Sequence, residues 1–324
     1  MIALQTSLPD GRACEAWQPK TIRLRYSLSY VKLFEVAFQA LEDTRPFNPE
    51  RPPADDPQPP FVDFPSGCDA IVVRHELLTS PIPVLTRLPN CIRYAPRQQP
   101  HFYTDLRGGP GQAFKTMSSK TRSTVVRKVK QYKAFCGGEI RWAQYRTPAE
   151  MEAFQKLARE LARKTYQERL FGSGLPEGEE FGARVAELAR QDAVRGYLLF
   201  HGDKPVAYLY TPAPDGFLVY EYLGYDPEYA KHSPGTVLQY LVLEMLYADQ
   251  RFPFYYWGYG YSQAKQVFST SQVLGADIFY IRPTLRNRIA VHLNHGFDRF
   301  SETAGKALES MHLKGAVKRW LKRQ

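Results

Sequence analysis

The stretch from Tyr220 to Ile281 decides the fold. It contains Tyr225-Asp226-Pro227, then Ser233-Pro234-Gly235-Thr236, and then Gly258-Tyr259-Gly260-Tyr261. Its hydrophobic pattern predicts a strand, a polar loop, a long helix over 236–249, a second strand, a short helix and a third strand. Because the Ser-Pro-Gly turn opens the long helix, we expect unpaired backbone N–H groups and the positive end of the helix dipole there. This combination suits a phosphate group.

The chain before this stretch also alternates between strands and helices. Apolar periodicity and turn residues predict helices over 118–135, 147–161 and 181–190, and strands over 139–145, 196–200, 205–210 and 217–225. From residue 139 onward the order is therefore β-α-α-β-β-β-α-β-α-β. Three hairpin-linked strands followed by a helical crossover indicate an α+β fold with a mixed, mostly antiparallel sheet.

The two ends of the chain are less regular. Residues 21–41 alternate like a strand at first and then favour a helix through Phe34, Phe38 and Leu41. Residues 44–67 are rich in proline and acidic side chains, which is typical of a loop. Short apolar runs predict strands over 69–74 and 91–95, and the tail over 285–322 is predicted to be helical. We therefore divide the chain into an N-terminal lobe (1–114), a central domain (115–284) and a basic helical tail (285–324).

Composition limits the location and the cofactors. The 324 residues contain no apolar run near the roughly 20 residues that span a bilayer, and Met1–Lys20 has no secretory h-region. A cytoplasmic protein is therefore predicted. The four cysteines are far apart and form no CxxC pair, so no metal site is expected.

Positive charge is concentrated in two segments. The formal net charge is +10, and much of the excess lies in 115–133 and in 314–323. Such clusters attract phosphates, nucleic acid or anionic lipid, although two solvated helix faces would look the same. The tail over 304–321 has apolar residues at helical spacing, so it is compatible with an amphipathic helix that places the protein at the periphery of the inner membrane. Packing of the tail on the enzyme is the alternative and favoured interpretation.

Several short pieces together carry a family resemblance. They are Ser119-Lys120-Thr121-Arg122, Lys164-Thr165-Tyr166-Gln167, Gly196-Tyr197-Leu198-Leu199-Phe200, Pro205-Val206-Ala207-Tyr208, Gly224-Tyr225-Asp226-Pro227, Ser233-Pro234-Gly235-Thr236-Val237-Leu238, and Gly260-Tyr261 with Lys265. As a set, over about 115–288, they resemble the CelD/BcsL-like family of GNAT-superfamily acyltransferases, which is similar to the two-lobed FemAB-type transferases. The resemblance implies a GNAT fold, two GNAT-like lobes followed by C-terminal helices, and acyl-CoA as a co-substrate rather than a permanently bound cofactor.

The resemblance also implies a phosphate loop. A typical GNAT loop reads Arg/Gln-x-x-Gly-x-Gly/Ala, whereas the matching stretch here has one glycine and a proline that removes a backbone donor. The phosphates of CoA would meet five residues: Lys231, His232, Ser233, Gly235 and Thr236. A simple Ser-Pro-Gly helix cap is the alternative interpretation.

Four residues are candidates for the chemistry of acyl transfer. Glu221 is flanked by large apolar residues, and its burial would raise the pKa of the carboxyl toward the range of a general base. Asp226 is a second candidate base, although a residue before proline also suits a turn. We predict Tyr261 as a general acid or positioning residue, with Lys265 four positions later on the same helix face.

The acceptor would lie beside Lys164, Tyr166 and Gln167, where the acceptor of a GNAT enzyme usually enters, and beside Tyr259. For any single tyrosine, aromatic packing is the competing account. As noted above, no metal is expected. No covalent acyl-enzyme is expected either, because no Ser-His-Asp arrangement has the context of a nucleophile elbow.

Three functions are compatible with this sequence. The first is transfer of an acyl group, most simply acetyl, from CoA to an amine or hydroxyl of a sugar or sugar-linked precursor of cellulose or exopolysaccharide; this acceptor is implied by the resemblance alone. The second uses an acyl carrier protein or aminoacyl-tRNA as the donor, docked on the basic helix of 115–133. The third is a non-catalytic scaffold at an anionic membrane surface.

Overall fold

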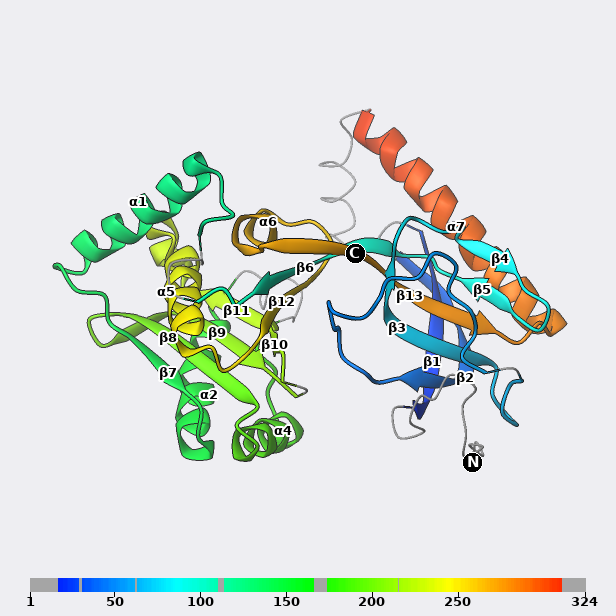
Figure 1. Ribbon diagram of the computed structural model, residues 1–324, viewed down its shortest axis with the longest axis horizontal. Helices are drawn as coiled ribbons and strands as arrows, with labels where there is room; N and C mark the ends of the chain where they lie inside the picture. The colour runs from blue at the N-terminus through cyan, green and yellow to red at the C-terminus, as the bar shows by residue number, and fades with distance from the viewer. Residues whose placement is uncertain are drawn as a thin grey trace. The chain divides into compact units, whose positions relative to one another are not determined.

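The computed structural model describes residues 17–28, 31–61, 63–109, 114–165, 174–214 and 216–310 (Figure 1). The chain forms two compact units. One unit comprises the chain before residue 100 together with the chain after residue 273, and the other comprises residues 100–273. Strands and helices are mixed in the chain, which confirms the predicted α+β class.

An antiparallel sheet forms the centre of the second unit. Its strands follow the order β11 (Tyr222–Tyr225), β9 (Lys204–Pro212), β8 (Val194–His201) and β7 (Trp142–Tyr145). Because successive side chains of a strand point to opposite faces, β8 and β9 contribute to two separate cores.

Helices cover both faces of this sheet, as Figure 1 shows. The helices α2 (Pro148–Ala162) and α4 (Glu179–Arg190) pack on one face. The long helix α5 (Pro234–Asp249) packs on the other, with α1 (Ser119–Phe135) against it. These helices begin and end close to the predicted positions, and Thr147 and Glu150 form a capping box at the start of α2.

The strand predicted over 217–225 is broken in two. Its first part, β10 (Leu218–Val219), pairs in parallel with β12 (Phe254–Tyr259), which pairs antiparallel with β6 (Gln98–Asp105). Its second part, β11, pairs with β9 instead. The break falls at Tyr220 and Glu221, where one backbone N–H donates to Tyr256 O at 2.8 Å and the next to Tyr210 O at 3.3 Å. A short 3₁₀ helix, η2 (Pro227–His232), and the helix α6 (Gln263–Phe268) complete the unit.

The first unit is built on a long hairpin and a mixed sheet. The strands β1 (Trp17–Leu28) and β2 (Val31–Asp43) form the hairpin, and β2 pairs in parallel with β3 (Ala70–Leu78). The strand β13 (Ser271–Ile281) pairs antiparallel with β3 and with β5 (Ile92–Tyr94), and β4 (Leu85–Arg87) pairs with β5. The helix α7 (Leu285–Ser310) packs against β1.

The prediction of a helix through Phe34, Phe38 and Leu41 is wrong, because these residues lie in β2. The spacing of Phe34 and Phe38 is even, so it fits a strand as well as a helix. Pairing with β1 decides in favour of the strand, with Phe38 and Ala40 buried and Gln39 between them exposed.

The units differ in their bounds from the domains predicted by sequence. Residues 285–310 group with the N-terminal part of the chain, because Ala290 and Val291 of α7 are buried in the same core as Tyr26. The Tyr26 hydroxyl donates a hydrogen bond to Ala290 O at 2.6 Å. The Pro-rich segment is a loop with one isolated bridge, from Ala54 to Leu78. The basic segment 314–323 lies outside the described residues.

Candidate active site

The strand break leaves one edge of β11 open. Asp226 N–H donates to Val206 O at 2.9 Å, and in this register every second residue of β11 is hydrogen-bonded to β9. The intervening residues, Leu223 and Tyr225, therefore direct their N–H and C=O groups away from β9. Because β11 ends the strand order of its sheet, these groups form an open edge.

The start of α5 lies against this strand. A Cβ on Gly235 would sit 3.2 Å from Leu223 Cδ2 and 3.5 Å from Tyr225 Cδ1, so a glycine permits the close approach. Ser233 precedes the helix in the left-handed region, with φ 52° and ψ 47°, and its side chain makes no capping hydrogen bond.

The first turn of α5 keeps unused backbone donors. Val237 N–H is the first to bond within the turn, to Ser233 O at 3.1 Å. Pro234 has no N–H, so the amides of Gly235 and Thr236 have no partner within the helix. These two amides point from the positive end of the helix dipole. The predicted phosphate loop is thus located at the end of an open strand edge.

The loop before α5 adds a cation and an imidazole. Lys231 is exposed, while His232 stacks on Phe135 with ring centroids 3.7 Å apart. Burial, together with the charges of Lys231 and His201, lowers the pKa of His232, which favours the neutral ring at neutral pH. The buried Nε2 of His232 has no hydrogen-bond partner among the described residues.

Glu221 lies at the strand break in an environment that suits a base. Its side chain is 23% exposed, and its Oε2 is 3.6 Å from Arg184 Nη2. Burial raises the pKa of Glu221, an effect that Arg184 and a hydrogen bond with Tyr222 partly offset. A carboxyl with a raised pKa is better matched to proton abstraction than an ordinary glutamate.

Asp226 lies at the other end of β11 and acts as a cap. Its carboxylate accepts a hydrogen bond from Glu228 N–H at 3.1 Å and pairs with Lys204 at 3.2 Å and Lys164 at 3.5 Å. Although burial alone would raise the pKa of Asp226, this hydrogen bond and the two ammonium groups hold it below the usual value. These contacts match the turn-forming interpretation of Asp226.

The predicted aromatic site begins at the end of β12. Tyr259 and Tyr261 are exposed, with 72% of Tyr261 accessible, and the Tyr261 ring contacts Phe102. The Lys265 ammonium donates to the Tyr259 carbonyl, and burial lowers the pKa of Lys265. The premise that Tyr261 and Lys265 share a helix face is wrong, because Ser262 caps α6 and Tyr261 precedes the helix.

Apart from Glu221, which pairs with Arg184, the structure brings sequence-predicted residues together in two groups. One joins Lys164 and Asp226 next to the loop of Lys231, His232 and Ser233, and the other joins Tyr259 with Lys265. Within the described ranges, no hydrogen bond or ion pair connects the two groups. Tyr166 and Gln167 lie outside the described residues.

Three side chains near these groups were missed by sequence reasoning. Lys204 and Arg184 hold the two carboxylates, and the buried His101 places its Nδ1 2.7 Å from the Tyr256 hydroxyl. Each contact joins elements far apart in the sequence, so no local pattern marks it. In the described part of the chain, no group of three or more His, Cys, Asp or Glu side chains is placed to hold a metal ion.

Residues 119–266 match the family model described as an acetyltransferase (GNAT) domain. These residues form a GNAT-type acyltransferase domain. The matched residues contain the strand break, the open edge of β11 and the start of α5, so the domain and the candidate site coincide. No helix of the described residues has both the length and the apolar character needed to cross a membrane.

Solved structures provide distant likenesses. L-PGS from Bacillus licheniformis is 12% identical, with a TM-score of 0.46, and the match covers 71% of this chain and 73% of that one. FemX is 9% identical, with a TM-score of 0.44 and coverage of 82% and 89%. A putative GNAT-family acetyltransferase from Novosphingobium aromaticivorans is 12% identical, with a TM-score of 0.32 and coverage of 67% and 76%. No curated protein matches the sequence.

Proposed function

We propose that the GNAT domain transfers an acyl group, most simply acetyl, from acyl-CoA directly to an amine or hydroxyl acceptor. One observation carries the proposal: the break at Tyr220 and Glu221 leaves an open strand edge beside the uncapped start of α5. A strand edge and a helix start are complementary to the two polar parts of CoA.

Each part of CoA has a chemical match in this site. The pantetheine arm contains amide groups, which can pair with the open edge of β11 as an added strand would. The pyrophosphate can accept hydrogen bonds from the amides of Gly235 and Thr236, supported by the hydroxyls of Ser233 and Thr236 and the charge of Lys231. Gly235 lets the helix start approach the strand closely enough to serve one ligand.

Glu221 acts as the general base in this proposal. It removes a proton from the acceptor amine or hydroxyl, whose nitrogen or oxygen then bonds to the thioester carbonyl carbon while the carbon–sulfur bond breaks. An N–H of the open β11 edge stabilises the negative charge that develops on the carbonyl oxygen. The leaving thiolate takes a proton, for which Tyr261 is the proposed donor. Lys265 and the neutral His232 have supporting roles.

The acceptor is proposed to lie beside Lys164, Tyr166, Gln167 and Tyr259. Its identity as a sugar or sugar-linked precursor of a surface polysaccharide rests on the resemblance to CelD/BcsL-like proteins. The cytoplasmic location also stays a prediction, as does attachment to an anionic membrane through 314–323.

Calorimetric titration with CoA and acetyl-CoA tests the donor. We expect saturable binding that Gly235→Asp abolishes, because the new carboxylate would face the phosphates and cancel the helix dipole. Gly235→Ala is the matched control: its methyl group meets the flexible end of Leu223 at 3.2 Å, so binding should weaken only modestly. Equal loss in both variants would point to packing rather than to phosphate contact.

The basic helix α1 favours a second candidate, in which the donor is carried by a tRNA or an acyl carrier protein. Val125 and Tyr132 anchor α1 in the core. Its cationic side chains have no carboxylate partner among the described residues; they are Lys120, Arg122, Arg127, Lys128, Lys130 and Lys133. Unpaired cations concentrated on one helix are well placed to bind a polyanion.

Salt dependence separates the two donors. If a tRNA or a carrier protein is the donor, affinity should fall steeply with salt, and charge reversal at Arg127 and Lys130 should reduce it at least tenfold. If free acyl-CoA is the donor, the same variant should keep its kcat/KM. No binding of CoA by the wild-type protein, together with steep salt dependence for tRNA, would replace the first proposal by the second.

A further inference from the structure

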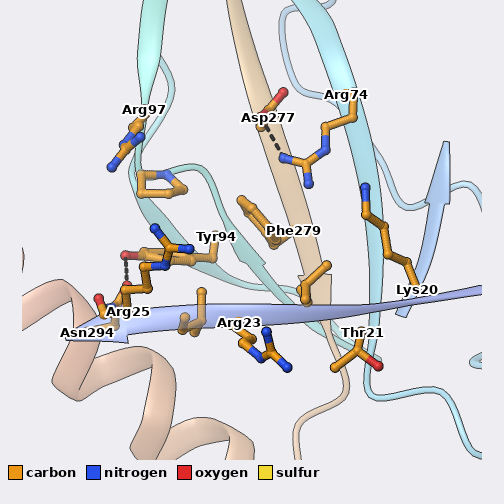
Figure 2. A pocket seen from close by; sticks show the side chains of 13 residues that line it. Lys20, Thr21, Arg23, Arg25, Arg74, Tyr94, Arg97, Asp277, Phe279 and Asn294 are labelled. Carbon is orange, nitrogen blue, oxygen red and sulfur yellow. Dashed lines mark hydrogen bonds and ion pairs between the residues drawn. The ribbon is translucent and has the colours of Figure 1, made fainter. Parts of the chain in front are cut away.

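A cavity of about 380 Å³ in the first unit has a strongly basic lining. It lies between β1 on one side and β3, β5 and β13 on the other (Figure 2). Five cationic side chains line it, Lys20, Arg23, Arg25, Arg74 and Arg97, together with a single carboxylate, that of Asp277. Glu35 and Glu42 reach some of these cations from β2. The cations therefore outnumber all the carboxylates that face them.

Two of the cations share one carboxylate and form one wall of the cavity. Arg74 pairs with Asp277 at 2.7 Å and with Glu42 at 2.9 Å, and Lys20 pairs with the same Glu42 at 2.7 Å. Arg74 also lies over the Phe279 ring, 5.6 Å from its centroid. This network holds one wall of the cavity in place, and it occupies most of the hydrogen-bond donors on that wall.

Two other cations keep their donors available. Arg97 is exposed, and it forms no ion pair or side-chain hydrogen bond with any described residue. Arg25 donates a hydrogen bond to Glu35 from Nε at 3.1 Å, and neither of its terminal nitrogens donates a hydrogen bond to a described residue. Figure 2 shows both guanidinium groups on the side of the cavity where Tyr94 lies, opposite Arg74 and Asp277.

The floor beneath these arginines is rigid. Tyr94 is fully buried and donates a hydrogen bond from its hydroxyl to Asn294 Oδ1 at 2.9 Å. Asn294 in turn donates from Nδ2 to the backbone carbonyl of Arg25 at 2.8 Å. The strand that carries Arg25 is therefore tied to α7 through a buried amide, and the arginine backbone is held in place before any ligand arrives.

We propose that this cavity binds the phosphate group of a phosphorylated ligand, through Arg25 and Arg97. Guanidinium groups match a phosphate with paired, charge-assisted hydrogen bonds, and two of them with free donors suit a group that carries up to two negative charges. The Phe279 ring supplies an apolar surface for the rest of the ligand, and Asp277 supplies an acceptor for its hydroxyl groups. This site lies in the first unit, and its existence does not depend on the proposed acyl transfer.

Calorimetry with glycerol 3-phosphate at low salt tests the site on the full chain. We expect saturable binding that weakens roughly tenfold in Arg97→Gln and more in the Arg25→Gln/Arg97→Gln double variant. Arg288→Gln is the matched control, because Arg288 is an exposed arginine of the same unit that does not line the cavity. Arg97 has no described partner, so its replacement should leave the melting temperature unchanged.

A second arm distinguishes a soluble phosphate ester from a lipid headgroup. Sedimentation with vesicles of phosphatidylglycerol in phosphatidylcholine is compared with sedimentation with phosphatidylcholine alone. Binding of glycerol 3-phosphate that the double variant loses supports a soluble ligand. Binding confined to the anionic vesicles and lost in the same variant supports a headgroup. The proposal is overturned if the wild type binds neither probe, or if Arg97→Gln binds as the wild type and Arg288→Gln do.

Discussion

The two ends of β11 carry carboxylates of opposite character. At its start Glu221 is partly buried beside one arginine, and burial raises the pKa of this carboxyl. At its end Asp226 is buried more completely, yet a backbone N–H and two lysines hold the pKa below its ordinary value. Only the four residues of β11 thus separate a group suited to taking up a proton from one suited to staying ionised.

The difference shows that burial alone does not identify a base. Asp226 is only 1% exposed, but a backbone hydrogen bond and two lysines compensate its charge and favour the ionised form. Glu221 has a single cation at 3.6 Å, so the cost of desolvation dominates. The number of donors around each carboxylate, rather than its depth, therefore separates a carboxyl suited to accepting a proton from one suited to staying ionised.

The largest effect is expected from Glu221→Gln. Loss of a general base lowers kcat by at least 100-fold, whereas CoA binding should be unchanged because the phosphates lie at the other end of β11. Steady-state kinetics and calorimetry on the same preparation check both parts. Retention of more than about half of wild-type kcat would remove Glu221 from the mechanism.

Asp226→Asn should act on stability instead. The amide can still accept from Glu228 N–H, but the two ion pairs are lost, and we expect a loss of about 1–3 kcal/mol in the free energy of unfolding. The native pKa of Asp226 is lowered, so its ionised form stabilises the fold above the unfolded-state pKa of about 3.9, and this is lost as pH falls through the native pKa.

Urea denaturation of the wild type and the Asn variant at neutral and acidic pH tests this assignment. The difference between the two proteins should be largest at neutral pH and should disappear in acid. If Asp226→Asn instead abolished turnover with an unchanged urea midpoint, the comparison between the two carboxylates would be reversed.

A smaller effect is expected when Arg184 is replaced by glutamine. Removal of its positive charge should raise the pKa of Glu221 further, because Arg184 now opposes the effect of burial. A base works in its deprotonated form, so the acidic limb of the profile of kcat/KM against pH should move to higher pH. Activity on the plateau should be nearly wild type. An unmoved limb would show that another group titrates there.

The smallest effect is expected from Lys164→Gln. Lys164 is exposed and lies farther from Asp226 than Lys204 does, so the loss of stability should stay below about 1 kcal/mol. Lys204→Gln is the comparison variant and should cost more. Because Lys164 is also a proposed acceptor contact, an increase in the KM for the acceptor in Lys164→Gln alone would sharpen its assignment.

Local sequence patterns were sufficient to predict most of the helices and strands of the second unit. Thr147 and Glu150 form a capping box at the start of α2, and Gly137-Gly138 follows the end of α1; both signals can be read from the sequence because they act within one helical turn. The break at Tyr220 was not predictable, since the residues on both sides of it are equally strand-like. One half pairs with β12 and the other with β9, and the sequence of the segment alone does not indicate which half joins which strand.

The candidate site residues show the same division between what local sequence indicates and what only the folded chain determines. Glu221 was recognisable because its apolar neighbours indicate burial, and Gly235 because it follows a helix-opening proline. The partners that set the two pKa values, Arg184 and Lys204, come from other elements and are found only in the folded chain. The misplacement of Tyr261 follows from a cap at Ser262, one residue later than the spacing argument requires.

The first unit draws on both ends of the described chain, as the bond between Tyr26 and Ala290, 264 residues apart, makes plain. During synthesis from the N-terminus, the second unit can close once residue 273 has emerged, while β1, β2 and β3 still lack β13 and α7. Contacts of such high sequence separation form late and leave apolar strand surface exposed in the meantime. The unit that begins first on the ribosome is therefore the one that must finish folding last.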